Sequence, residues 1–170
     1  MKAVLLSFLD VFLLRAGPQA FPRSRVLLTV CLLAYLLTDV VVDWLQGYSA
    51  VPMVLGSVFD CGYWLLAFTL TLGAWSVLPR LEQTLSAWFG AGLLFNIIDL
   101  PLAGIARLFP NPDVQAWLNL PVFLLILWSM AVMAHLLHDA LRSHYALAVV
   151  VAAVTGTINI LLSLYLFPLA

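Results

Sequence analysis

Five long runs of apolar residues divide the chain, and short polar joints separate them. Each run is long enough to cross a bilayer, because a spanning helix needs about 20 mostly apolar residues. The runs predict five membrane-spanning helices at approximately residues 26–44, 51–78, 84–108, 114–138 and 145–167. The second run is long enough to tilt or to break near Gly62. The pattern therefore predicts an all-α fold, an integral membrane helical bundle that forms a single domain over residues 1–170.

The joints between the runs contain residue types that end helices, and each is only a few residues long. They lie at residues 46–49, 79–82, 109–113 and 142–144. Such short connections predict that neighbouring helices run antiparallel. In the third joint, Asp113 is placed to cap the fourth spanning helix.

The first fifteen residues form a shorter apolar stretch, which Asp10 interrupts. This stretch is too short to span a membrane, and Lys2, Asp10 and Arg15 would lie near the headgroups. It therefore predicts an interfacial amphipathic helix over residues 1–15. A signal peptide is the alternative, because Lys2 precedes an apolar run. Residues 18–20 are a poor cleavage site, however, which favours the interfacial helix.

Composition makes lipid the solvent for this chain. Hydrophobic residues are 65% of the sequence and charged residues 9%, whereas a soluble domain carries about 25% charged residues. A soluble fold of this size exposes roughly a third of its surface and could not hide so many apolar side chains. A soluble enzyme and a disordered tail are therefore excluded. The net charge of −1 provides no basic patch for nucleic acid.

Two features of the sequence bear on location. Cys31 and Cys61 lie within apolar runs, which favours buried thiols over a disulfide. Six of the seven Lys and Arg residues precede the first spanning helix or fall in the second and fourth joints, and Arg107 alone falls on the opposite side. Because positive residues collect on the cytoplasmic side, the N-terminus is predicted in the cytoplasm and the C-terminus outside. The membrane assumed is the bacterial inner (cytoplasmic) membrane.

Polar residues inside the spans carry the main functional signal, because carboxylates there are costly and usually face the bundle interior. Three aspartates are predicted in the outer half of the membrane, within about two helical turns of one level. Asn159 reaches a similar level, Asn119 lies slightly shallower, and Asn96 shares a helix stripe with Asp99. The predicted polar cluster comprises Asp39, Asp60, Asn96, Asp99 and Asn159. It is either a cation or proton site, or a set of helix-packing and interface groups.

Stripes of small and polar residues repeat on two of the predicted helices. They comprise Gly92, Asn96, Asp99 and Ala103 on the third spanning helix, and Ala152, Gly156, Asn159 and Ser163 on the fifth. Because small residues let helices approach closely, we expect these stripes to face each other or a shared centre. Asp43, one turn after Asp39, is assigned to the interface instead.

A second cluster lies at the inner end of the fourth spanning helix. His135, His138, Asp139 and Arg142 share one helical face. Imidazole and carboxylate groups could bind a transition metal there, and His135 could be one haem ligand. The alternative is a solvated helix C-terminus, which favours cationic side chains. No second set of ligands is visible, so no cofactor is predicted.

The sequence carries no motif of nucleophilic or metal-dependent hydrolysis, which predicts a protein that is not an enzyme. Trp64, Phe68 and Trp75 form a stripe that is interpreted as packing.

One local motif suggests a family. Residues 14–24, Leu-Arg-Ala-Gly-Pro-Gln-Ala-Phe-Pro-Arg-Ser, lead into a spanning helix. This run resembles the start of small uncharacterised proteobacterial multi-pass membrane proteins. Five spans after a cytoplasmic N-terminal segment are similar to the topology of Yip1-type membrane proteins. The resemblance implies a helical bundle that binds other membrane proteins, and it implies no catalytic residue.

Two functional hypotheses follow from the sequence. The first is an accessory subunit or assembly factor that packs against a larger membrane complex. The alternative is a component of a small cation or proton transporter or channel, which would use the polar cluster. The predicted partners are the lipid bilayer and another membrane protein or a second copy of the chain, with no nucleic acid.

Overall fold

The computed structural model describes residues 2–167 and is helical almost throughout. The α-helices of this range are α1 (Lys2–Phe12), α2 (Arg25–Gln46), α3 (Ala50–Ala74), α4 (Leu81–Leu108), α5 (Pro112–Leu141) and α6 (Tyr145–Leu166). Short 3-10 turns, η1 (Pro18–Ala20) and η2 (Leu78–Arg80), lie between them, and the described residues contain no strand. Helices α2 to α6 are long and apolar enough to cross a membrane. The predicted all-α class and the five candidate spans are therefore confirmed.

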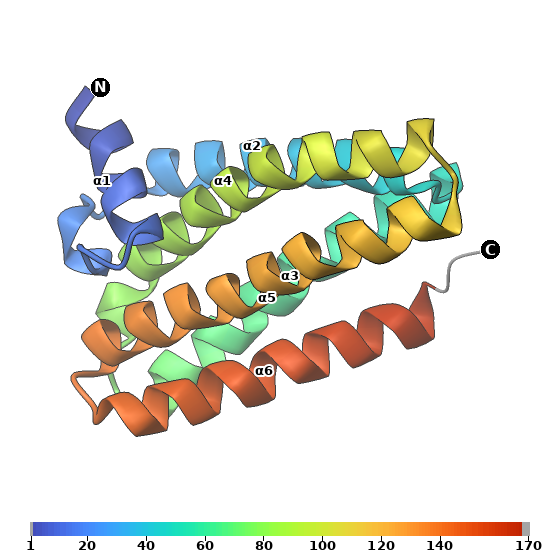
Figure 1. The fold of residues 1–170 in the computed structure, drawn as a ribbon. Helices are drawn as coiled ribbons and strands as arrows, with labels where there is room; N and C mark the ends of the chain where they lie inside the picture. The colour runs from blue at the N-terminus through green and yellow to red at the C-terminus, as the bar shows by residue number, and fades with distance from the viewer. Residues whose placement is uncertain (1, 168–170) are drawn as a thin grey trace.

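The five long helices lie side by side and alternate in direction, whereas α1 crosses one end of the bundle (Figure 1). Helix α4 packs most extensively against α2 and also contacts α5, and α5 packs against α6. We call the end where α2, α4 and α6 begin the N-terminal end, and the other the opposite end. Helix α3 contacts α2, α4 and α6, so it completes a bundle around a shared centre.

Local chemistry fixes the ends of α2. Ser24 precedes its first turn, and the Ser24 hydroxyl accepts a hydrogen bond from the backbone N–H of Leu27 at 3.3 Å. At the other end Gly47 adopts a left-handed conformation, with φ of 97°. The backbone N–H of Tyr48 then donates to the carbonyl of Asp43 at 3.1 Å. This bond closes the helix, and a side chain at position 47 would strain the turn.

Helix α3 continues unbroken through Gly62, so the predicted break is excluded and the alternative, a tilt, stays a prediction. Two helix ends differ from the predicted ones, and the first is the end of α3, at Ala74 rather than near residue 78. The helix closes in a turn where Ser76 adopts a left-handed conformation, with φ of 56°, and the backbone N–H of Val77 donates to the carbonyl of Leu72 at 2.9 Å. Helix α5 is capped by Asn111, whose side-chain oxygen accepts from the N–H of Asp113 at 3.0 Å. Asp113 is not the cap, because Pro112 already occupies the first helical position.

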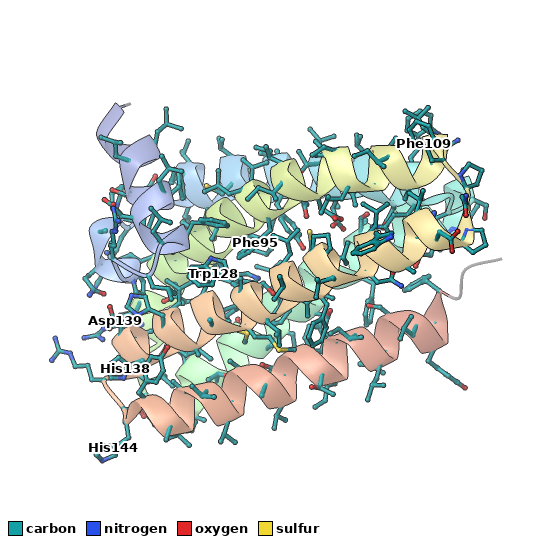
Figure 2. The ribbon with its side chains drawn as sticks, in the orientation of Figure 1. Phe95, Phe109, Trp128, His138, Asp139 and His144 are labelled. Atoms are coloured by element: carbon teal, nitrogen blue, oxygen red, sulfur yellow. The ribbon has the colours of Figure 1, made fainter. Side chains whose placement is uncertain are left out.

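Helix α1 packs against α4 and α5. Val11 is fully buried, and the Phe12 ring lies 4.8 Å from the ring of Phe95. The indole N–H of Trp128 donates to the carbonyl of Phe12 at 2.9 Å, and Figure 2 shows Trp128 and Phe95 on neighbouring helices beneath this segment. The predicted short N-terminal helix thus forms and docks on the bundle. Its position at a membrane interface stays a prediction.

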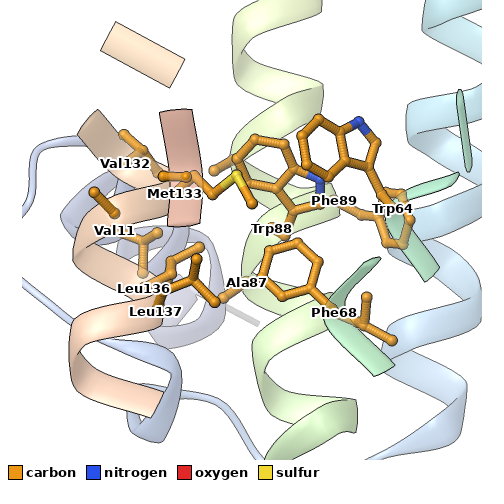
Figure 3. Packing of buried hydrophobic residues seen from close by; sticks show 14 of the residues in the cluster. Val11, Trp64, Phe68, Ala87, Trp88, Phe89, Val132, Met133, Leu136 and Leu137 are labelled. Carbon is orange, nitrogen blue, oxygen red and sulfur yellow. The ribbon is translucent and has the colours of Figure 1, made fainter. Parts of the chain in front are cut away.

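A packed apolar core fills the bundle toward its N-terminal end. Figure 3 shows Phe68 of α3, Phe89 of α4 and Leu136 of α5 in this core, and all three are essentially inaccessible. Cys31 and Cys61 are free thiols buried in the same cluster, as their apolar surroundings predict. Interiors packed in this way leave little room for water. The residues of the predicted polar cluster lie on the other side of this core, where they line two cavities.

Candidate functional site

Two cavities occupy the part of the bundle beyond the apolar core. The central cavity has a volume of about 240 Å³ and is lined from all five long helices. The end cavity, of about 180 Å³, reaches toward the opposite end, where Tyr48, Pro52 and Phe167 line it. Tyr35 and Asp60 line both cavities. These two side chains therefore form the wall between them.

Asp60 of α3 accepts hydrogen bonds from three helices. The Tyr35 hydroxyl of α2 donates to its Oδ2 at 2.8 Å. The Trp64 indole N–H and the Asn159 amide of α6 both donate to its Oδ1, each at 3.0 Å. All three bonds end on the carboxyl oxygens of Asp60. They tie α2, α3 and α6 together at one point.

Asp39 and Asp43 of α2 face the end cavity together with Asp60. Asp39 Oδ1 accepts from the Asn96 amide at 3.5 Å, and Asp43 Oδ2 accepts from the Ser57 hydroxyl at 3.3 Å. The sequence assigns Asp43 to the interface, and that depth stays a prediction. The structure adds that Asp43 lines the same cavity as Asp39 and Asp60, as expected of residues four apart on one helix face.

Tyr48 closes the end cavity between α2 and α3. Burial, and secondly the charge of Asp43, raise the pKa of the Tyr48 phenol above its usual value. The phenol is therefore a neutral hydroxyl at physiological pH and can donate a hydrogen bond to a group in the cavity.

The remaining residues of the predicted cluster line the central cavity. Asp99 accepts from the Gln46 amide at 3.4 Å, and Asn96 donates to the Thr38 hydroxyl at 3.2 Å. Asn96 and Asn159 thus bond to different aspartates rather than to each other. The two small-residue stripes face a shared centre, since Gly92, Asn96, Asp99, Gly156 and Asn159 all line this cavity.

Aromatic residues that sequence reasoning did not assign to the site form much of the central cavity wall. Tyr35, Trp64, Trp88 and Phe95 line it. Trp64 belonged to a stripe interpreted as packing, yet it lies one helical turn after Asp60 and donates to it. That spacing is the signal that could have identified it. Trp75, at the end of the same stripe, is 40% exposed and lies outside both cavities.

Neither cavity is lined by a Lys, Arg or His side chain. Arg107, the cation nearest in sequence to Asp99, instead stacks on the Trp44 ring with its guanidinium carbon 4.6 Å from the ring centre. It also donates to the Trp44 carbonyl at the end of α2. Among the described side chains, those of residues 4–167, the one ion pair is Arg25 with Glu82, at 3.2 Å on the exposed N-terminal end. The cavity carboxylates therefore have no protein cation beside them.

The histidine cluster forms a set of structural contacts at the N-terminal end (Figure 2). His138 Nδ1 lies 2.7 Å from the Ser143 carbonyl, and Asp139 Oδ2 accepts from the Gln19 amide at 3.1 Å. Within the described part of the chain, no three His, Cys, Asp or Glu side chains are grouped so that they could hold a metal ion. The proposal of a metal site at His135, His138 and Asp139 thus gains no support from the geometry.

Comparison with models of protein families, with curated proteins and with solved structures gives no match. The resemblance of residues 14–24 to small proteobacterial membrane proteins, and of the topology to Yip1-type proteins, stays a prediction. The function is therefore argued from the cavities themselves.

Proposed function

We propose that this protein is a non-enzymatic membrane protein that binds a small cation and takes part in its transport. The observation that carries the proposal is the end cavity, where Asp39, Asp43 and Asp60 meet without a cationic side chain in the lining. Charged groups within a span are expensive unless they are paired, and they mark ion and substrate pathways. A bound cation or proton would supply the missing charge.

The arrangement favours a carrier over an open pore. The Tyr35–Asp60 hydrogen bond separates the two cavities. Beyond the central cavity, the core around Phe68, Phe89 and Leu136 fills the N-terminal end. A cation that enters at the opposite end therefore reaches Asp60 but meets a packed core. Passage would require α3 or α6 to shift against the remaining helices, as in carriers with a gated central site.

The test is uptake into proteoliposomes with Na⁺, K⁺ and H⁺ offered separately. Asp60→Asn keeps the size of the side chain but removes its charge, and we expect at least a tenfold loss of the flux of the transported ion. Asp113→Asn is the matched control, because Asp113 is exposed at the opposite end and lines neither cavity. Flux that is equal in the two variants, or absent from the native protein for all three ions, contradicts the proposal.

An accessory subunit remains a second candidate, and helix α1 favours it. Leu5, Leu6 and Leu9 of α1 are 61%, 58% and 45% exposed, although α1 is too short to cross a bilayer. Such a face needs lipid or a protein to cover it. Native mass spectrometry of the tagged protein from its own membrane tests this candidate. A stoichiometric partner that is lost in Leu6→Gln supports a subunit role, and a lone chain contradicts it.

A further inference from the structure

We propose that the N-terminal end of the bundle binds an anionic phospholipid, with an acyl chain against the exposed leucines of α1 and the phosphate held by neighbouring arginines. The inference goes beyond the proposed cation binding and does not involve the cavities. Three features carry it. They are the outward apolar face of α1, a set of arginines without a partner in the protein, and the loop that places these arginines at the same end.

Helix α1 is apolar on two sides. Toward the bundle it places Phe8 and Val11, and Val11 is fully buried. Away from the bundle it exposes Leu5, Leu6 and Leu9. Because α1 crosses the end of the bundle (Figure 1), a bundle that spans the bilayer would place this outer face at the boundary between headgroups and hydrocarbon. Acyl chains are the apolar groups available there.

The arginines at this end fall into two groups. Arg25 is held in its ion pair, and Arg80 donates to the last carbonyls of α5. Arg15, Arg23 and Arg142 are exposed, and their guanidinium groups have no hydrogen bond, ion pair or ring contact with the described residues. A planar guanidinium matches a phosphate with two parallel hydrogen bonds. These three side chains are therefore available to phosphate oxygens.

The loop between α1 and α2 holds two of these arginines near the third. Gln19 of this loop donates to Asp139 near the end of α5 at 3.1 Å. Arg142 lies three residues after Asp139, so this bond brings the loop that carries Arg15 and Arg23 to the joint that carries Arg142. A further hydrogen bond from α4 reaches a carbonyl of the loop. The three charges are therefore held on a fixed stretch of backbone rather than on a free tail.

Charge favours an anionic lipid over a neutral one. At this end Glu82 is paired with Arg25 and Asp139 is bonded to Gln19, which leaves Asp10 as the other acidic side chain described there. Each basic side chain near an anionic membrane surface strengthens binding by about fivefold. A protein partner would have to bring acidic groups and an apolar strip to the edge of the bilayer, whereas an anionic phospholipid combines them in one molecule.

The experiment is native mass spectrometry of the full chain, released from nanodiscs with equal amounts of phosphatidylglycerol and phosphatidylcholine of identical acyl chains. Both leaflets have the same composition, so the orientation of the protein does not affect the result. We expect the protein to retain phosphatidylglycerol in preference to phosphatidylcholine. Arg15→Gln, Arg23→Gln and Arg142→Gln together should abolish this preference, whereas the three corresponding Lys substitutions should keep most of it.

The matched control for Arg15→Gln is Arg107→Gln. It removes the same charge at the opposite end, where the guanidinium is already engaged with Trp44. Arg15→Gln should lower the preference for phosphatidylglycerol by about fivefold, and Arg107→Gln should leave it unchanged. Equal retention of the two lipids by the native protein, or equal effects of the two substitutions, overturns the inference.

A second readout tests the leucine face. A fluorescent label is attached at Leu6→Cys, or at Leu120→Cys as the matched control, since these leucines are 58% and 60% exposed. Cys31 and Cys61 are buried and react slowly by comparison. Phosphatidylglycerol with brominated acyl chains should quench the label at position 6 more than brominated phosphatidylcholine does, and both should quench the control label equally. Equal quenching at position 6 overturns the inference. So does a stoichiometric protein that is retained from the native membrane in place of phosphatidylglycerol and lost in Leu6→Gln.

Discussion

Gly92→Ala tests how much the Tyr35–Asp60 hydrogen bond, which lies between the two cavities, contributes to the stability of the fold. Gly92 of α4 lies against the ring of Tyr35, and a Cβ there would be 2.7 Å from Cε2 and 2.8 Å from Cδ2. Non-bonded carbon atoms sit about 3.5–4.0 Å apart, so the ring would have to move by roughly 0.8–1.3 Å. The Tyr35 hydroxyl is 2.8 Å from Asp60 Oδ2. A shift of that size along the bond would break it.

The expected cost follows from two contributions. A hydrogen bond to a charged group is worth about 1.5–3 kcal/mol, and an extra methyl group in a packed site costs about 1–3 kcal/mol. The two overlap because the same ring movement causes both. We therefore expect Gly92→Ala to lower the free energy of unfolding by about 2–4 kcal/mol. The matched control is Gly104→Ala on the same helix, where an added Cβ meets no atom within 4 Å.

The assay is reversible unfolding in mixed micelles, followed by far-ultraviolet circular dichroism. Repeating the substitution in a Tyr35→Phe background isolates the hydrogen bond, because that background has already lost it. There the cost of Gly92→Ala should shrink by about 1.5–3 kcal/mol. The reasoning is refuted if Gly92→Ala and Gly104→Ala have the same unfolding free energy, or if the Tyr35→Phe background leaves the cost unchanged.

Three further predictions concern the ends of the bundle. Gly90→Leu should displace α1, because a Cβ at Gly90 would lie 2.0 Å from the Phe8 ring; limited proteolysis should then cut residues 13–17 faster than in Gly104→Ala. Arg80→Met should remove two bonds to the last carbonyls of α5. We expect a loss of about 1–2 kcal/mol and faster hydrogen exchange at residues 139–142 than at the start of α6. Alkaline phosphatase fused after residue 170 should be active and after residue 79 inactive if the N-terminus is cytoplasmic.

The spans could be predicted because the length and apolar composition of a run of residues are enough to identify them. An apolar run of sufficient length has few folds available in lipid, where the backbone must satisfy its own hydrogen bonds. The ends of the helices were less predictable, because single residues decide them. A left-handed turn at Ser76 closes α3 early, and Pro112 moved the cap of α5 from Asp113 to Asn111.

The sequence could predict the level of the polar residues along the helices, but not which neighbours their side chains would face. The rise of a helix places Asp39, Asp60 and Asp99 near one level, and all three line the two cavities. The rotation of each helix depends on how it packs against its neighbours. The sequence therefore could not show that Tyr35 and Asn159, 25 and 99 residues from Asp60, would both donate to it. Nor could it show that Trp88 faces the same space.

The docking of α1 sets an order for biosynthesis. The Trp128 N–H that holds the carbonyl of Phe12 lies 116 residues further along the chain. At a synthesis rate of about 5–20 residues per second, that partner is made roughly 6–23 s after Phe12. Helix α1 leaves the ribosome before α5 and cannot form this contact until α5 exists. Its apolar surface therefore needs lipid or a helper protein during that interval, before its own chain can cover it.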